Sequence, residues 1–168
     1  RAEPLGVDAE RMRAWLDAGY HGNMQYLADT ADVRFDPTDE RMLAGARSVI
    51  VFASTYANAG TQAEGPAPGR VARYAQARDY HRVIYDRLRP MKRLLRSAGF
   101  QARTAVDGMP VMERAWAQRA GVGFIGKNCC LIVPGIGSHV FLGVVMTTAE
   151  LPPDEPMRER CGSCRLCL

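Results

Sequence analysis

The stretch Ser48-Val49-Ile50-Val51-Phe52-Ala53-Ser54 decides the fold that the sequence predicts. Its five inner residues are all apolar, which is the pattern of a strand buried on both faces. A second apolar run, from Val140 to Thr148, predicts another long strand. Between these runs, residues 57–69 contain three glycines and two prolines among small polar residues, which predicts a long surface loop.

Helical patterns alternate with the strands. The longest covers residues 79–98, where apolar side chains recur at helical spacing and Gly99 follows as a stop signal. Pro90 lies inside this pattern, so we expect a kink or two helices placed end to end. We also expect helices over 8–16 (with Asp8 as N-cap), 21–27, 39–43 and 110–120, strands over 100–106 and 129–133, and a polar turn at 34–37. The interleaved pattern predicts a mixed α+β domain.

Composition excludes some classes of protein. A chain of 168 residues that is 47% hydrophobic can bury one core, and its longest apolar runs are too short to span a bilayer. The net charge of +4 permits an RNA partner without requiring one. Three of the five cysteines cluster, as ligands do in reduced compartments, so we expect a cytoplasmic location and no membrane contact.

The clustered cysteines are Cys161, Cys164 and Cys167, in a C-x2-C-x2-C pattern. This spacing is typical of the bacterial ferredoxin run, in which thiolates converge on an iron–sulfur cluster and a fourth cysteine follows. The alternative is a structural zinc site, although zinc sites usually pair two cysteine units across a loop. Because the run stops early, we expect the chain to be a fragment in which residues 151–168 are a linker and the start of a ferredoxin-like segment. Cys129 and Cys130 are expected to be buried core thiols of a strand.

The stretch from Gly121 to Asn128 matches G-x-G-x-x-G and most of a phosphate-loop motif. Both motifs require a strand before and a helix after the glycines, and here the predicted order is reversed. Asn128 also replaces the hydroxyl residue that would hold magnesium. We therefore expect a tight turn or a close approach of the backbone to a flat, bulky group, and no nucleotide site.

Asp107 is a candidate general acid. It ends a predicted strand, where α/β proteins place their sites, and partial burial there would raise its pKa and let it donate a proton. The alternative is a carboxylate that caps the helix expected to begin at Pro110. On the helix over 79–98, four arginines share one face, which suits either a solvated surface or an RNA contact: Arg82, Arg89, Arg93 and Arg96.

Several motifs together resemble the epoxyqueuosine reductase family over nearly the whole chain. They are His21-Gly22-x-Met24-x-Tyr26-Leu27, Arg73-Tyr74-Ala75, Arg78-Asp79-Tyr80-His81, Val106-Asp107-x-x-Pro110-Val111-Met112-Glu113-Arg114, Ala120 to Asn128, Phe141-Leu142-Gly143 and the cysteine run.

The resemblance implies an oxidoreductase that reduces the epoxide of epoxyqueuosine at the wobble position of tRNA to give queuosine. It implies a cobalamin, two [4Fe-4S] clusters in the full-length protein, an electron donor such as a flavodoxin or ferredoxin system, and a monomer. A nitroreductase-like cobalamin- and substrate-binding domain would cover residues 1–150. Asp107 matches the family's proton donor, and His81 lies in a stretch near the cobalamin. Arg34, Tyr74, Lys127 and Asn128 are carried over as residues that bind cofactor or substrate, and Cys161, Cys164 and Cys167 as metal ligands.

Gly108 and Met109 depart from the serine and small residue expected after the aspartate, which affects the shape of the pocket more than the acid. Two rival functions stay open at this point. One is another cobalamin and iron–sulfur reductase, similar to the reductive dehalogenases, and the other is a non-catalytic module for electron transfer or cobalamin trafficking.

Overall fold

The computed structural model describes residues 1–57 and 69–167. Its centre is an antiparallel sheet in the order β1-β5-β2, formed by β1 (Ser48–Thr55), β5 (Val140–Thr147) and β2 (Ala102–Ala105). Thr147 of β5 pairs with Ser48 on one side and with Ala102 on the other. Both neighbours run antiparallel to β5, so β1 and β2 point toward the same end of the sheet.

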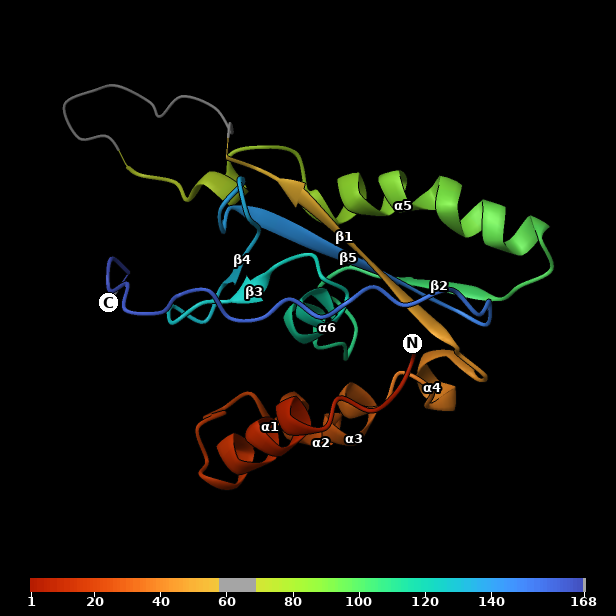
Figure 1. The fold of residues 1–168 in the computed structure, drawn as a ribbon, viewed down its shortest axis with the longest axis horizontal. Coiled ribbons are helices and arrows are strands. Elements are labelled where there is room, and N and C mark those ends of the chain that lie inside the picture. The colour runs from red at the N-terminus through yellow and green to blue at the C-terminus, as the bar shows by residue number, and fades with distance from the viewer. Residues whose placement is uncertain (58–68, 168) are drawn as a thin grey trace.

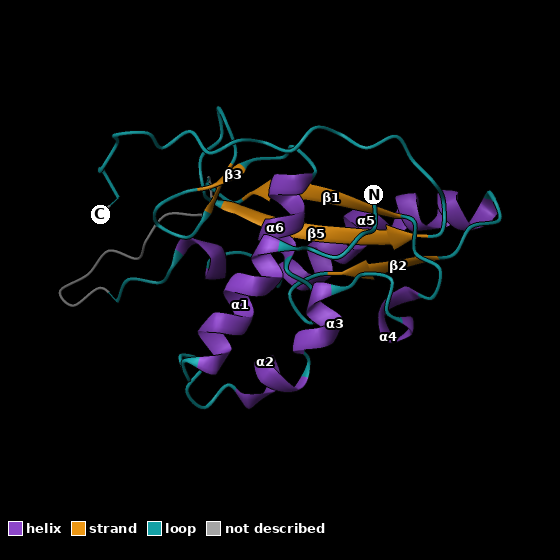
Figure 2. Cartoon of the chain, turned by 60° about the horizontal axis from the view of Figure 1, so that its bottom comes forward, coloured by secondary structure: helices purple, strands orange, loops and turns teal. Residues whose placement is uncertain are grey.

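Helices cover both faces of this sheet (Figures 1 and 2). Helix α5 (Tyr80–Ser97) lies on one face, and α6 (Glu113–Arg119) lies on the other. Four short helices precede β1 on the α6 side: α1 (Val7–Asp17), α2 (Gln25–Asp29), α3 (Ala31–Phe35) and α4 (Glu40–Leu43). The expected mixed α+β class is confirmed.

Strand β5 joins two apolar clusters. Val144 and Met146 pack with Trp116 of α6, whereas Val145 packs with Ile84 and Leu88 of α5. Alternate side chains of a strand point to opposite faces, so the continuous apolar run of β5 fits a strand covered on both sides.

The same burial was expected of β1, and there the expectation is wrong. Strand β1 forms at the predicted place, but seven of its eight residues are only half-buried or exposed. Within the described residues it has a sheet neighbour on one side only, because it lies at the edge of the sheet.

Helix α5 is one uninterrupted helix that contains Pro90, so the two-helix alternative is wrong. Proline removes one backbone donor, and the apolar stripe packed against β5 compensates for this loss. Gly143 of β5 allows this close packing. A Cβ atom there would lie 2.7 Å from Cγ2 of Ile84 and 2.8 Å from Cδ1 of Leu88.

Other boundaries differ from the expected ones. Helix α6 begins at Glu113 because residues 107–110 form bends, and α3 occupies part of the predicted polar turn. Gly6 caps α1 in place of Asp8, and α2 begins at Gln25, four residues late. The helix expected over 39–43 is confirmed as α4, capped by Asp39. The loop expected over 57–69 lies almost wholly outside the described residues.

The segment after β5 has neither helix nor strand from 150 to 161, as expected of a linker. It is anchored to α6 by paired hydrogen bonds, since the Met157 amide donates to Gln118 and the Gln118 side chain donates back to the Met157 carbonyl. In the described part of the chain, no helix combines the length and apolarity needed to cross a membrane.

Candidate active site around Asp107

Asp107 lies two residues beyond the end of β2, which ends opposite Val144 of β5, whereas β1 continues further and ends opposite Val140. Its φ of 52° is in the left-handed region, which is unusual for a residue with a side chain. The side chain of Asp107 is 67% exposed, so the partial burial expected at this position is wrong. The chain therefore presents a carboxyl group to solvent from a backbone conformation that needs outside support. Asp107 does not cap α6, whose N-cap position is Met112.

Tyr80 and His81 reach Asp107 from the N-terminus of α5. The Tyr80 hydroxyl donates a short hydrogen bond to Oδ2 of Asp107, and Nε2 of His81 lies 3.9 Å from the same oxygen. Asp79 caps the helix by accepting from the His81 amide, and its Oδ1 lies 2.9 Å from Nδ1 of His81. This hydrogen bond to His81 is the main cause that lowers the pKa of Asp79.

The Tyr80 ring is held between two other rings. It stacks on Phe141 of β5 with centroids 4.2 Å apart, and on His81 with centroids 4.0 Å apart. Partial burial, and then the hydrogen bond to Asp107, raise the pKa of Tyr80. The phenol therefore stays protonated and remains a hydrogen-bond donor at neutral pH.

Glu113 is a second carboxyl group beside Asp107, and the sequence analysis did not single it out. Its Oε1 is buried without a hydrogen-bond partner in the described structure. Burial raises the pKa of Glu113, the charge on Asp107 raises it further, and Arg34 acts in the opposite direction. The signal in the sequence that could have found Glu113 was an acidic residue in the first turn of a helix, shortly after a candidate catalytic aspartate.

Arg34 and Tyr74 lie on the two sides of this region. Arg34 is near enough to Glu113 to influence its pKa, and its Nε donates to Thr30 over 3.1 Å. Tyr74, in a 3-10 turn (Arg73–Ala75), is about half exposed and influences the pKa of Tyr80. Nearby, the Gln76 carboxamide donates to the Val71 carbonyl, while its oxygen is buried with no hydrogen-bond partner in the described structure.

Lys127 and Asn128 make their hydrogen bonds in a different part of the molecule. Nζ of Lys127 donates to the carbonyls of Gly162 and Cys164, over 2.8 and 3.1 Å, and so ties the cysteine segment to the rest of the domain. The Asn128 side chain accepts from the Cys130 amide and closes its own turn. The structure therefore gives these two residues contacts away from Asp107.

The three clustered cysteines are not gathered into a metal site within the described residues. All five cysteines are free thiols, and the Cys164 amide donates to the Cys161 carbonyl in a tight turn. The donor chemistry suits a cluster, but the described residues contain no group of three metal-binding side chains gathered around one point. The residues present do not fit an iron–sulfur cluster by themselves.

The expectation for Cys129 and Cys130 is wrong. Both are exposed, and they precede the short strand β4 (Leu131–Ile132). Cys129 has a φ of 60°, because the chain turns here to pair β4 with β3 (Phe124–Ile125).

The glycines of the 121–128 stretch serve this hairpin. A Cβ atom on Gly123 would lie 2.5 Å from the Ile132 carbonyl oxygen, and one on Gly126 would lie 2.6 Å from Cδ1 of Ile132. A strand follows the glycines, so the expected absence of a phosphate-loop geometry is confirmed, and the tight-turn alternative is correct.

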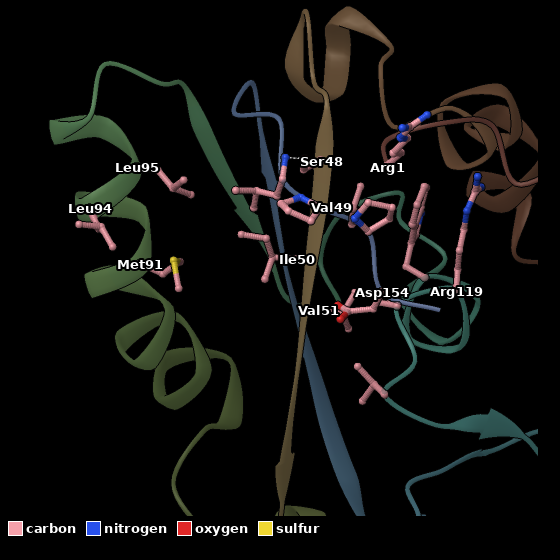
Figure 3. Close-up of a pocket in the computed structure, with 16 residues that line it drawn as sticks. Arg1, Ser48, Val49, Ile50, Val51, Met91, Leu94, Leu95, Arg119 and Asp154 are labelled. Carbon is pink, nitrogen blue, oxygen red and sulfur yellow. Dashed lines mark hydrogen bonds between the residues drawn. The ribbon is translucent and has the colours of Figure 1, made fainter. Parts of the chain in front are cut away.

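A separate apolar cleft of about 510 Å³ lies along the free edge of β1. Figure 3 shows Met91, Leu94 and Leu95 of α5 on one side of this strand, and Arg119 and Asp154 on the other. None of the groups around Asp107 lines this cleft.

Comparison with known proteins shows which proteins the chain is similar to. The family model described as "Epoxyqueuosine reductase QueG, DUF1730" matches residues 34–108. An epoxyqueuosine reductase from Gloeobacter violaceus is 45% identical over the whole chain, which covers 52% of that relative. One from Synechococcus sp. (strain RCC307) is 39% identical over 99% of the chain and 51% of its own length. The chain thus spans about half the length of these relatives.

The solved structures that match this chain are also epoxyqueuosine reductases. A selenomethionine-labelled epoxyqueuosine reductase matches 98% of this chain and 44% of its own, with a TM-score of 0.82 and 28% identity. A second epoxyqueuosine reductase, solved with an epoxyqueuosine-modified tRNA-Tyr stem loop, matches 97% of this chain and 44% of its own, with a TM-score of 0.81 and 27% identity. A third, from Bacillus subtilis, matches 98% of this chain and 44% of its own, with a TM-score of 0.78 and 28% identity. In that structure an aspartate catalytic loop is swung out of the active site. Over nearly its whole length, the chain is therefore similar to epoxyqueuosine reductases.

Proposed function

We propose that the protein reduces the epoxide of epoxyqueuosine in tRNA to the alkene of queuosine, with Asp107 as the proton donor. The names of the relatives support the reaction, and the relative solved with a modified tRNA stem loop supports the substrate. The observation that carries the role of Asp107 is its exposed carboxyl group, held by Tyr80 at the edge of the sheet. We take the Asp107 loop to correspond to the catalytic loop of the Bacillus subtilis relative.

The chemistry requires more than side chains. Converting an epoxide into an alkene breaks two C–O bonds, consumes two electrons and two protons, and releases water. Amino-acid side chains do not supply the two electrons that this reduction consumes, so a redox cofactor must supply them. The task of the protein is to orient the modified base, to exclude competing water and to deliver a proton to the departing oxygen.

Cobalamin is the cofactor that the family resemblance implies, and the surface beside Asp107 fits a flat ring with amide substituents. Tyr74 offers an exposed aromatic face, and the buried, unpaired Gln76 oxygen could accept a hydrogen bond from a corrin amide. Nε2 of His81 lies 3.9 Å from Oδ2 of Asp107. When bound, a reduced corrin supplies electrons to the substrate carbon. The [4Fe-4S] clusters, which a flavodoxin or ferredoxin system would reduce, need ligands beyond the three cysteines of this chain.

The tRNA phosphates would contact basic side chains of α5. Of the four arginines on one face, Arg89 is paired with Asp86, and Arg96 donates to the Ala102 carbonyl over 3.5 Å. Arg82 is 84% exposed and makes only a long contact with Asp79, and Arg93 is exposed and makes no hydrogen bond or ion pair with a described residue, so these two are the residues of this face best placed for RNA. A modified base in an anticodon loop is splayed out, which lets it reach a side chain such as Asp107. Action on tRNA would place a monomeric protein in the cytoplasm.

The test is turnover by the full-length protein, purified without oxygen and given a chemical reductant. The expected result is conversion of epoxyqueuosine-containing tRNA to queuosine-containing tRNA, detected by mass spectrometry of the nucleosides, together with corrin and cluster absorption. Reduction of a halogenated small molecule in place of the tRNA would favour the dehalogenase-like alternative. Cofactor absorption without any turnover would favour an electron-transfer or trafficking module.

A further inference from the structure

The two oxygens of Asp107 have different surroundings. Oδ2 accepts the Tyr80 hydroxyl and faces Nε2 of His81 at 3.9 Å. In the described part of the chain, no hydrogen bond or ion pair involves Oδ1 of Asp107. A carboxylic acid carries its proton on one oxygen at a time, so a donor fixed on Oδ2 favours the proton on Oδ1.

Tyr80 is rigid enough to make this choice. Its ring is stacked between Phe141 and His81, and its backbone starts α5 directly after the Asp79 cap. The raised pKa of Tyr80 keeps its hydroxyl protonated, so it stays a donor whether Asp107 is neutral or ionised. The groups that face the pair are His81 and Asp79 on α5, with Glu113 on α6.

The loop itself gives Asp107 little support. A positive φ is less favourable for a residue with a side chain than for glycine, although aspartate adopts it more readily than most. The backbone contacts within the loop are two tight turns, in which the Gly108 amide approaches the Val106 carbonyl at 2.5 Å and the Val111 amide donates to the Met109 carbonyl over 2.7 Å, and neither holds the Asp107 side chain. The carboxylate of Asp107 therefore depends on a contact from another element for its position, and Tyr80 supplies it.

We propose that Tyr80 is a positioning residue that holds Asp107 through Oδ2 and so presents Oδ1 as the oxygen that delivers the proton. This inference rests on the proposed function. In the step, the Oδ1–H bond breaks, an O–H bond forms on the substrate oxygen, and the negative charge stays on the Asp107 carboxylate. Tyr80 keeps its own proton. Its hydrogen bond strengthens as that charge develops, because bonds to ionised acceptors are stronger than bonds to neutral ones.

The test compares Tyr80→Phe with Tyr85→Phe in the full-length, cofactor-loaded protein. Phenylalanine keeps the stacked ring and removes only the hydroxyl. Tyr85 is an exposed tyrosine of the same helix, with no hydrogen bond to any described residue. Tyr80→Phe should lower kcat about ten- to hundredfold and leave KM for the modified tRNA unchanged, as expected when a catalytic group is misplaced. Tyr85→Phe should match the wild type.

Two further measurements separate positioning from general damage. Backbone amides 106–110 should exchange with deuterium faster in Tyr80→Phe than in Tyr85→Phe, because the anchor of the loop is lost. In an Asp107→Asn background, Tyr80→Phe should cause no additional loss of rate, since Tyr80 acts through Asp107. Wild-type rate and wild-type exchange in Tyr80→Phe would overturn the inference, as would an additional loss in the Asp107→Asn background. If the wild-type protein does not reduce the tRNA, the proposed function fails, while the exchange experiment still decides whether Tyr80 holds the loop.

Discussion

The Tyr80 hydroxyl donates to Oδ2 of Asp107 across 27 residues of sequence and joins the start of α5 to the loop after β2. Both ends are fixed by the sheet, because Tyr80 stacks on Phe141 of β5 and Asp107 follows a strand paired with β5. The candidate acid is therefore positioned by the central strand through two independent connections.

The Asp79 cap should support both the helix and the site. Replacing Asp79 with Ala removes the acceptor for the His81 amide and should lower the free energy of unfolding. It should also lower the reduction rate, since Tyr80 and His81 begin this helix. Denaturant unfolding measures the first effect. Asp79→Ser is the matched control, because serine still caps; if it lost as much stability as Asp79→Ala, the cap would not be the cause.

Close packing of α5 on the sheet depends on Gly143. Gly143→Ala should destabilise the protein by about 1–3 kcal/mol, since the added methyl group overlaps Ile84 and Leu88. Thermal or denaturant unfolding would show the loss. Gly69→Ala places its methyl group in open space and should leave the unfolding free energy nearly unchanged. Equal stability of the two variants would show that α5 has room to move away from β5.

The buried carboxyl of Glu113 makes stability depend on pH. Because its pKa is raised in the folded protein, the native state binds this proton more tightly than the unfolded state. Its contribution to stability is therefore fully present below the ordinary glutamate pKa and is lost as pH rises through the raised value. Glu113→Gln, which is neutral at every pH, removes this dependence.

The wild type should consequently lose stability relative to Glu113→Gln as pH rises from the ordinary glutamate pKa of 4.5 through the raised pKa of Glu113. Melting temperatures of both proteins across this range provide the measurement. A difference between the two that is constant with pH would mean that Glu113 is not protonated preferentially in the folded state. Glu40→Gln, at an exposed position, should show no such trend.

Lys127 should hold the cysteine segment in place. Lys127→Met removes the donor to the Gly162 and Cys164 carbonyls, so the thiols of Cys161 and Cys164 should react faster with an alkylating reagent in the cofactor-free protein. Mass spectrometry of the modified peptides gives the rates. Lys92→Met on α5 is the control and should not change them. Unchanged alkylation in Lys127→Met would mean that these hydrogen bonds do not restrain the segment.

The sequence predicted the elements better than their surroundings. The long apolar runs gave β1 and β5 at the right places, since strand formation is a local tendency. Which of them is central depends on pairing between distant segments, so the burial of β1 was overestimated. Cys129 and Cys130 were misplaced for a related reason. Their apolar neighbours suggested a strand, whereas the hairpin of β3 and β4 needs a left-handed turn there.

The candidate site was predictable in part. Asp107 stood out because it follows a strand and precedes Pro110, and the structure brings His81 close to it. The role of Tyr80 was not visible in the sequence, since it depends on a contact between the start of a helix and a loop 27 residues away. Lys127 was carried over from its motif as a residue that binds cofactor or substrate, and this stays a prediction; in the structure its amine contacts the cysteine segment.

The identity of the proton donor is tested most directly by the single-turnover rate of epoxyqueuosine reduction in tRNA by full-length Asp107→Asn protein. Asparagine preserves the shape of the side chain and cannot donate an acidic proton. We expect the rate to fall by about 10²- to 10⁴-fold, the usual contribution of a general acid, with tRNA binding and cofactor absorption unchanged. Reduction at the wild-type rate by Asp107→Asn would contradict the role of Asp107 as the proton donor.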